Sequence, residues 1–237
     1  MLRLVKGIYK FSRLSGTLGI SVSYTLLGVL VAIAENHTLN SGKIALLFIA
    51  NEIAVISTFM INDIEDADED REDIKKRVRN PVSSGLIKPK EGYIITWTTI
   101  MLAAILYWFI NNTVLLIGVS IIIVGYIYSW KRIRLKIKPP LDIISHLYFL
   151  GIAITITVYA SVGINSINSA LMLVIIALTS INIEINNGIR DYQLDIDTNV
   201  KTSVGVLGLK KANYLRIFNY FLVTIAGIYL LLELFLV

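Results

Sequence analysis

The chain has 237 residues, of which 55% are apolar and only 16% are charged, and its mean hydropathy is +0.70. A soluble globular protein has too little interior to bury so much apolar surface, so that class is excluded. The absence of cysteine excludes disulfides and thiolate metal sites, and the net charge of +5 indicates contact with anionic lipid headgroups, since no soluble basic domain is present to bind nucleic acid.

Apolar segments of about 20 residues recur along the chain, and a helix of that length crosses the apolar core of a bilayer. They lack the alternation of membrane β-barrel strands. The sequence therefore predicts an all-α polytopic membrane bundle of seven transmembrane helices, formed by a single domain over residues 1–237. The predicted spans are Leu14–Ala34, Ile44–Ile61, Tyr93–Ile110, Val114–Trp130, Ile143–Val162, Ile167–Ile189 and Ile217–Leu236.

Basic residues predict how these spans are oriented. Of the 22 Lys and Arg residues, only Lys43 lies on one predicted side. All the others precede the first span or lie in the connections after spans two, four and six. Basic loops stay in the cytoplasm, so we expect a multi-pass cell-membrane protein with a cytoplasmic N-terminus and cytoplasmic active-site loops.

Acidic residues concentrate after the second span, where eight of the 17 fall between Asp63 and Asp73. If the helix continues past the membrane, Asn62, Asp66 and Asp70 lie one turn apart on one face, with Asp63 beside them. Carboxylates at this spacing repel one another, and a bound divalent cation removes that penalty. The alternative is a solvated acidic loop.

A second polar column follows the sixth span, where Glu184, Asn187, Asp191 and Asp195 share one helix face. Both columns leave the membrane on the same predicted side, so the fold could bring them together over one cavity. Facing carboxylates without cysteine suit hard cations such as Mg²⁺, which binds one or two carboxylates together with substrate phosphates.

A basic segment, Lys131–Lys138, follows the fourth span. Its cations could neutralise a phosphate-bearing ligand, although a topology signal or a headgroup patch is the alternative. The basic residues Lys75–Arg79 are interpreted as a solvated face. Cations, two acidic columns and a lipid-lined interior together predict a site for an amphiphile with a polyphosphate head.

These motifs resemble those of the UbiA superfamily of intramembrane prenyltransferases. Asn62-Asp63-x-x-Asp66-x-x-x-Asp70 resembles its first aspartate-rich motif, and Asn187-x-x-x-Asp191-x-x-x-Asp195 resembles its second. The loop 79–87 and the stretch 128–136 are similar to two further family segments. The family usually has nine spans, two more than are predicted here.

The resemblance implies Mg²⁺-dependent transfer of a polyprenyl group from an allylic polyprenyl diphosphate to an acceptor, with an aromatic quinone precursor expected. A glycerol-phosphate lipid or carotenoid acceptor is the alternative, and a non-catalytic UbiA-like protein or a cation transporter is the alternative from another class. The implied metal-binding residues are Asn62, Asp66, Asp70, Asp191 and Asp195. The implied catalytic residues are Asp63, Asp66 and Asp191, and the implied substrate-binding residues are Asn187, Arg190, Tyr128, Lys131, Arg134 and Lys136.

Three isolated ionisable residues have two interpretations each. Glu52 lies near the middle of span two, where a carboxylate either faces the substrate chamber or joins helices by hydrogen bonds. His146 is expected to be interfacial or hydrogen-bonded rather than catalytic. Glu184 either supports the second column or holds helices together.

The distribution of basic residues generates a topology prediction. Reporters fused after Ser83, Pro139 and Val200 should each report the cytoplasm, and a reporter after Asn112 should report the opposite side. The measurement is paired phosphatase and fluorescent-protein fusion. A single long loop on the opposite side would contradict the shared site, because the columns could not meet.

Overall fold

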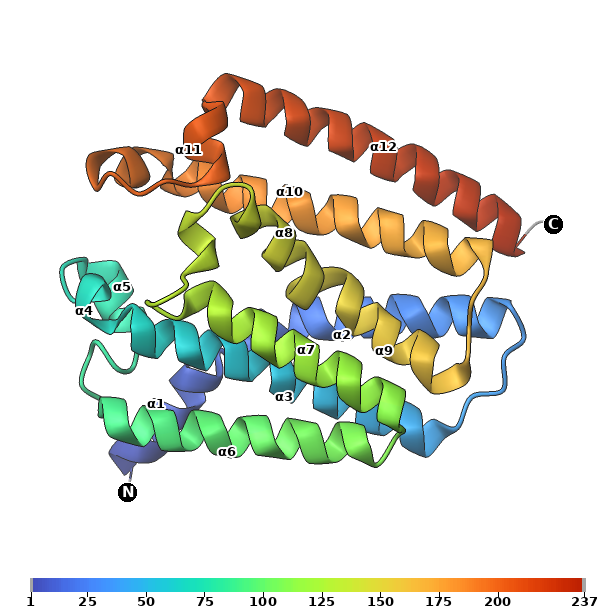
Figure 1. The fold of residues 1–237 in the computed structure, drawn as a ribbon, viewed down its shortest axis with the longest axis horizontal. Helices are drawn as coiled ribbons and strands as arrows, with labels where there is room; N and C mark the ends of the chain where they lie inside the picture. The colour runs from blue at the N-terminus through green and yellow to red at the C-terminus, as the bar shows by residue number, and fades with distance from the viewer. Residues whose placement is uncertain (1, 236–237) are drawn as a thin grey trace.

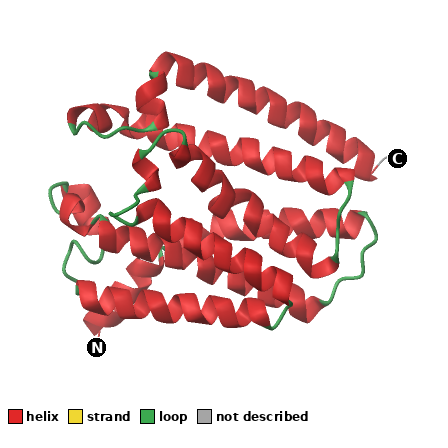
Figure 2. Cartoon of the chain, in the orientation of Figure 1, coloured by secondary structure: helices red, strands yellow, loops and turns green. Residues whose placement is uncertain are grey.

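Helices provide all the regular structure in residues 2–235, the part of the chain described by this computed structural model (Figure 2). The long helices lie side by side, and the short helices and polar loops gather at one end (Figure 1). The elements are α1 (Leu2–Ser12), α2 (Leu14–Ala34), α3 (Ser41–Glu65), α4 (Ala67–Asp70), α5 (Ile74–Arg79), α6 (Pro89–Trp108), α7 (Asn112–Ser129), a 3₁₀ turn (Leu135–Ile137), α8 (Leu141–Leu147), a π-helical turn (Tyr148–Ile152), α9 (Ala153–Val162), α10 (Ile167–Asp197), α11 (Ser203–Leu207) and α12 (Leu209–Phe235).

A helix occupies each of the seven predicted spans. In the described residues, six helical stretches are long and apolar enough to cross a membrane: Arg3–Ala34, Ser41–Glu65, Asn112–Ser129, Leu141–Val162, Ile167–Asp197 and Leu209–Leu234. The helix of the third predicted span, α6, is not among them. Leu236, the predicted end of the seventh span, lies outside the described residues.

Two helices extend well beyond their predicted spans. The second predicted span, Ile44–Ile61, lies within α3, which begins after the cap Asn40 and continues to Glu65. The sixth, Ile167–Ile189, lies within α10, which continues to Asp197. Both extensions carry polar columns, so each column is built on a helix that is anchored in the apolar core.

Polar side chains join the long helices inside the bundle. Asn51 of α3 is fully buried and donates to Thr25 of α2 at 2.9 Å and to Thr157 of α9 at 3.1 Å. Its carbonyl oxygen accepts from the hydroxyl of Tyr107 of α6 at 2.8 Å. One amide therefore connects four helices, and its polar groups are satisfied where lipid and apolar side chains offer no partner.

Glu52 follows the second of its two sequence interpretations. Its carboxylate accepts hydrogen bonds from Thr17 and Ser21 of α2, and it does not line the main cavity. The residue is 8% exposed. It therefore holds α2 against α3, and the chamber role considered from the sequence is not supported by its position.

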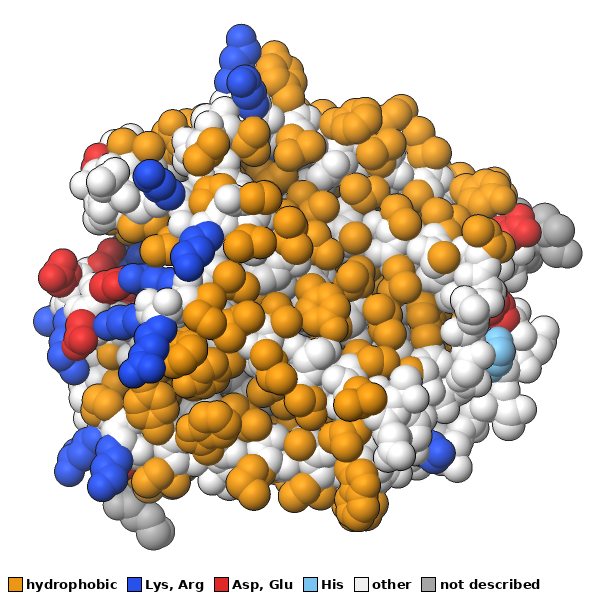
Figure 3. Space-filling view, in the orientation of Figure 1, with side chains coloured by type: hydrophobic (Ala, Val, Ile, Leu, Met, Phe, Trp, Pro, Cys, Tyr) orange, Lys and Arg blue, Asp and Glu red, His pale blue; other side chains and the backbone are white. Residues whose placement is uncertain are grey.

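Charged and apolar side chains separate along the molecule. Figure 3 shows hydrophobic side chains over the middle of the visible face and most Lys, Arg, Asp and Glu at one end. The same end carries α4, α5, α11 and the polar loops (Figure 1). This distribution is that of a bundle with its middle in lipid and one charged face in water.

Candidate functional site

A large cavity opens at the charged end of the bundle. It has a volume of about 1110 Å³ and is lined from α3, α4, α5, α7, the loop after α7, α8 and α10. Its polar wall contains both carboxylate columns, and its apolar lining includes Phe59, Phe149 and Leu150. The sequence prediction that the columns share one cavity therefore agrees with the structure.

The first column keeps its helical spacing across a short break. The backbone leaves α3 after Glu65 and enters α4 at Ala67, yet the amide of Asp66 donates to Asn62 O at 3.0 Å and that of Asp70 to Asp66 O at 2.8 Å. Asn62, Asp66 and Asp70 thus remain one turn apart and line the cavity.

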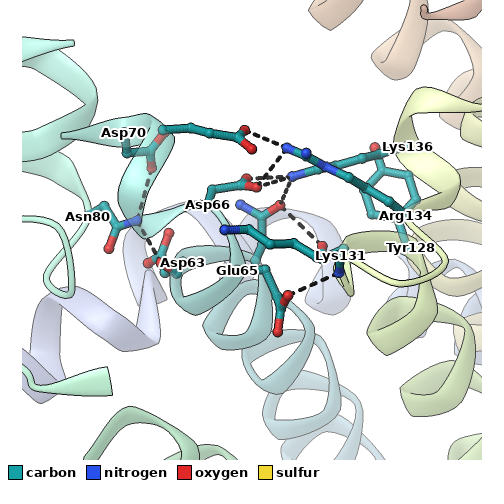
Figure 4. Close-up of polar contacts among 12 residues, drawn as sticks. Asp63, Glu65, Asp66, Asp70, Asn80, Tyr128, Lys131, Arg134 and Lys136 are labelled. Atoms are coloured by element: carbon teal, nitrogen blue, oxygen red, sulfur yellow. Dashed lines mark hydrogen bonds and ion pairs between the residues drawn. The ribbon is translucent and has the colours of Figure 1, made fainter. Parts of the chain in front are cut away.

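Cations from the loop after α7 compensate this column (Figure 4). The Lys136 ammonium donates to both carboxylate oxygens of Asp66 and to Asn62 Oδ1, the latter at 3.2 Å. The Arg134 guanidinium pairs with Glu69 and lies 3.5 Å from Asp66 Oδ1. Arg134 itself has a left-handed backbone (φ 51°), uncommon for a side chain of this size, which turns the loop back toward the column.

Arg134 helps to lower the pKa of Glu69. Burial alone would raise the pKa of Glu69, but the hydrogen bond and positive charge of Arg134 outweigh it and lower that pKa below its usual value. Glu69 is thus held ionised at the cavity mouth, where it keeps the guanidinium in place.

The second column runs along α10. Arg190 donates to Asn187 Oδ1 at 3.0 Å, and its Nε lies 3.5 Å from Asp191 Oδ1. Thr202 donates to Asp195 Oδ2 at 3.1 Å. Arg190, Asn187, Asp191 and Asp195 all line the cavity, facing the first column across it.

Asp63, predicted as a catalytic residue, does not line the cavity. Its fully buried carboxylate pairs with Arg13, and its carbonyl oxygen accepts from the Asn80 amide at 2.8 Å. The reason is rotational: Asp63 lies about 100° around the helix from Asn62, which turns it toward the N-terminal segment.

Lys131 is the other predicted site residue that lies outside the cavity lining. Its backbone amide donates to Glu65 Oε2 at 3.0 Å, and its ammonium lies 3.7 Å from Asp68 Oδ2 at the surface. Tyr128, Arg134 and Lys136, predicted from the same stretch, do line the cavity. In an irregular loop, neither helix nor strand periodicity indicates which side chains point toward the cavity. The sequence therefore did not distinguish Lys131 from the residues that line it.

Asn80 is a site-supporting residue that sequence reasoning did not select. Its buried amide donates to Asp70 Oδ2 at 2.9 Å, and its carbonyl oxygen accepts from the amides of Val82 and Ser83 at 2.9 and 3.2 Å. The sequence did contain an indication of this role, because Asn80 lies between Arg79 and Pro81 at the start of a turn, where asparagine side chains commonly bind the backbone. Asn80 fixes the end of the first column to the loop that follows α5.

A polar network lies on the α10 side of the cavity. The Tyr128 hydroxyl donates to Glu184 Oε1 at 3.0 Å, and His146 Nε2 lies 3.5 Å from Glu184 Oε2. His146 Nδ1 lies 3.1 Å from Ser180 Oγ. Tyr128, His146 and Glu184 all line the cavity and connect α7, α8 and α10.

The donor set fits Mg²⁺ bound together with a ligand's own oxygens. In residues 2–235, no group of three or more His, Asp and Glu side chains is placed to hold a metal ion by itself. Mg²⁺ commonly takes one or two carboxylates and completes its octahedron with phosphate oxygens and water. Asn62, Asp66 and Asp70 on one wall, and Asp191 and Asp195 on the other, supply oxygen ligands of the required kind.

The contacts of Asn80 generate a stability prediction. Asn80→Ala should lower the free energy of unfolding by about 1–3 kcal/mol, because buried partners at Asp63, Asp70 and the loop lose their hydrogen bonds. The measurement is thermal unfolding in detergent, with limited proteolysis of the 71–88 segment. Asn213→Ala, at an exposed amide, is the control. Equal melting of both variants would contradict the role.

Both the sequence and the fold are similar to those of known proteins. A sequence profile described as the UbiA prenyltransferase family matches residues 21–237. No curated protein matches the sequence. Among solved structures, a UbiA homologue from Archaeoglobus fulgidus bound to GPP and Mg²⁺ is 20% identical and has a TM-score of 0.78, covering 96% of this chain and 78% of that chain.

Two further structures have the same fold. The homologue from Archaeoglobus fulgidus bound to DMAPP and Mg²⁺ is 19% identical with a TM-score of 0.76, covering 94% of this chain and 77% of that chain. A digeranylgeranylglyceryl phosphate synthase is 23% identical with a TM-score of 0.73, covering 95% of this chain and 76% of that chain. The fold is common to all of them, and the profile spans most of the sequence. The chain therefore belongs to the UbiA prenyltransferase family, a family of enzymes that transfer prenyl groups.

Proposed function

We propose that this protein transfers a polyprenyl group, in a Mg²⁺-dependent reaction, from an allylic polyprenyl diphosphate to an aromatic quinone precursor. The observation that carries the proposal is the pair of carboxylate columns, on α3–α4 and α10, that face one cavity with apolar residues in its lining. The diphosphate donors bound with Mg²⁺ in the Archaeoglobus fulgidus homologue support the donor class.

In this proposal, Asn62, Asp66 and Asp70 hold one side of the Mg²⁺–diphosphate, and Asp191 and Asp195 hold the other. Bound Mg²⁺ would supply positive charge for the oxygens of the departing diphosphate. Asp63 orients the column from behind through Arg13 and Asn80.

Lys136 and Arg134 bind the donor head by exchanging partners. They now pair with Asp66 and Glu69 at the cavity wall. With Asp66 holding Mg²⁺, the Lys136 ammonium and the Arg134 guanidinium would be free to donate to the oxygens of the diphosphate. Asn187 and Arg190 complete the polar lining around the head.

The apolar lining receives the prenyl chain and limits water. Phe59, Ile143, Phe149, Leu150 and Ile183 all line the cavity. A carbon that develops positive charge as diphosphate leaves would be captured by water in an open site, so a dry lining protects transfer to the acceptor.

The shared metal site predicts that either column is essential. Asp66→Asn and Asp191→Asn should each lower Mg²⁺-dependent diphosphate release from allylic diphosphates by about 100-fold or more, because each removes a charged oxygen ligand. The assay is diphosphate release by the purified, monodisperse protein in detergent with and without acceptor. Asp68→Asn, a 73% exposed carboxylate outside the cavity, is the matched control. A near-normal rate in either test variant would contradict joint binding.

A phosphate-bearing glycerol lipid is the second candidate acceptor, because one observation favours it. Lys76 and Arg79 of α5 line the cavity, whereas Lys75 and Arg77 do not. The predicted solvated face therefore includes two residues that also line the cavity, of which Lys76 is half-buried and Arg79 is exposed. Asp70, Glu72 and Asp73 line the same cavity, so carboxylates as well as these two cations are present in its lining.

The two acceptors predict different results for these cations. With an aromatic acceptor, the Lys76→Gln/Arg79→Gln variant should keep the acceptor KM within about threefold of wild type. Loss of ionic contacts to an acceptor phosphate would instead cost roughly 1.5–3 kcal/mol, more than tenfold in KM. Lys75→Gln/Arg77→Gln carries the same charge change outside the cavity and is the control. A rise in the acceptor KM that is confined to Lys76→Gln/Arg79→Gln would identify the acceptor as a phosphorylated lipid alcohol.

A further inference from the structure

We infer that Glu184, together with Tyr128 and His146, forms the subsite for the acceptor's hydroxyl group, and that the Glu184 carboxylate takes the acceptor proton. This inference rests on the proposed prenyl transfer. It adds the chemical class of the acceptor, a molecule with a reacting hydroxyl, and a residue for a proton that the metal site does not receive.

Compensation of charge distinguishes Glu184 from Asp66 and Glu69. Asp66 and Glu69 each pair with a Lys or Arg side chain. Among residues 2–235, the ion pairs of Glu184 include no Lys or Arg, and its one ionisable partner is His146. Its hydrogen-bond donors are the neutral Tyr128 hydroxyl and the Asn187 amide, at 3.0 and 3.3 Å. A carboxylate with these partners keeps lone pairs that can accept a further hydrogen bond.

Burial and shape suit a base in a small polar pocket. The side chains of His146 and Glu184 are 7% and 16% exposed, and both line the cavity. Phe149 packs against the rings of Tyr128 and His146, with centroids 5.2 and 6.1 Å apart. The rings hold Tyr128 and His146 in place beside the carboxylate, and the apolar contact excludes bulk water from it.

The depth of Glu184 also fits an acceptor site. Glu184 and Asp191 are seven residues apart on α10, so they lie on nearly one face and about 10 Å apart along the axis. A diphosphate held at Asp191 would place its ester carbon on the inner side of the phosphates, toward Glu184. A hydroxyl between that carbon and Glu184 could attack one group and donate its proton to the other.

Prenyl transfer breaks one bond to the prenyl carbon, forms another and moves one proton. The bond between the prenyl carbon and the diphosphate oxygen breaks, and diphosphate leaves with the electron pair. An alcohol acceptor forms a carbon–oxygen bond, whereas a phenol forms a carbon–carbon bond at the ring and becomes a dienone. In both cases the hydroxyl proton passes to Glu184, and tautomerisation of the dienone then restores the phenol.

The test compares Glu184→Gln with wild type on two hydroxyl acceptors, a hydroxybenzoate and a glycerol-phosphate ether lipid with one free hydroxyl. The variant keeps the shape and the acceptor oxygen for Tyr128 but has no proton-accepting carboxylate. For the acceptor that wild type uses, kcat should fall by about 100-fold or more, while the donor KM changes by less than threefold. Glu52→Gln, at a buried interhelical carboxylate outside the cavity, is the matched control and should retain wild-type kcat.

An acceptor that is already ionised separates a base from a structural role. A nitro-substituted phenol, ionised at the assay pH, needs no base, so the loss in Glu184→Gln should shrink below tenfold. Glu184→Asp retains a carboxylate and should have a kcat at least tenfold above that of Glu184→Gln. If Glu184→Gln does not fold, Glu184→Asp provides the test of the base. Its rate on the ionised phenol, divided by its rate on the ordinary phenol, should exceed the same ratio for wild type.

Several results would overturn the inference. Equal losses on ionised and ordinary phenols would show a structural role, as would a kcat in Glu184→Gln within tenfold of wild type on the ordinary acceptor. Wild-type turnover of only a polyene acceptor without a hydroxyl would exclude a hydroxyl subsite. Failure of wild type to release diphosphate with any acceptor would overturn the proposed prenyl transfer as well, and so differs from failure of Glu184 alone.

Discussion

Repulsion between two columns of carboxylates is the constraint on which the rest of this structure depends. Helices α3–α4 and α10 bring their acidic faces to one cavity, where partial exclusion of water strengthens the repulsion. Lys136 and Arg134 compensate one column, and Arg190 lies against the other. These charges lie at the ends of long, flexible side chains. A ligand that contains both a metal ion and phosphate can therefore replace their contacts without unfolding the helices that form the cavity walls.

The short elements at the charged end supply partners for charges that the long helices cannot satisfy alone. Arg13, at the junction of α1 and α2, pairs with the buried Asp63. Asn80, at the end of α5, binds Asp70 and the carbonyl group of Asp63. A buried carboxylate without such a partner costs several kcal/mol. Arg13 and Asn80 therefore maintain the geometry of the columns, although neither lines the cavity.

Local periodicity explains how much could be predicted from the sequence. The polar columns repeat at three and four residues, so Asn62, Asp66, Asn187 and Asp191 could be placed on helix faces before any contact was known. Partners are separated by 50 residues for Arg13 and Asp63 and by 70 for Lys136 and Asp66, and no repeat indicates them. The direction of a side chain beyond a helix end could not be predicted in this way, and Lys131, which follows α7, lies outside the cavity. Asp63 lies outside it as well, although its neighbour Asn62 lines it.

The cavity's polarity changes with depth, and this order separates the parts of the reaction. Charged oxygen ligands and cations lie at its mouth, Glu184 of α10 lies deeper and accepts from Tyr128 of α7, and aromatic and aliphatic side chains complete the lining. A diphosphate would be drawn to the mouth because only that region can compensate its charge. A hydroxyl can compete with water for Tyr128 and Glu184 deeper in, where ionic ligands are too costly to desolvate. Donor head and acceptor can thus be bound together without competing for the same side chains.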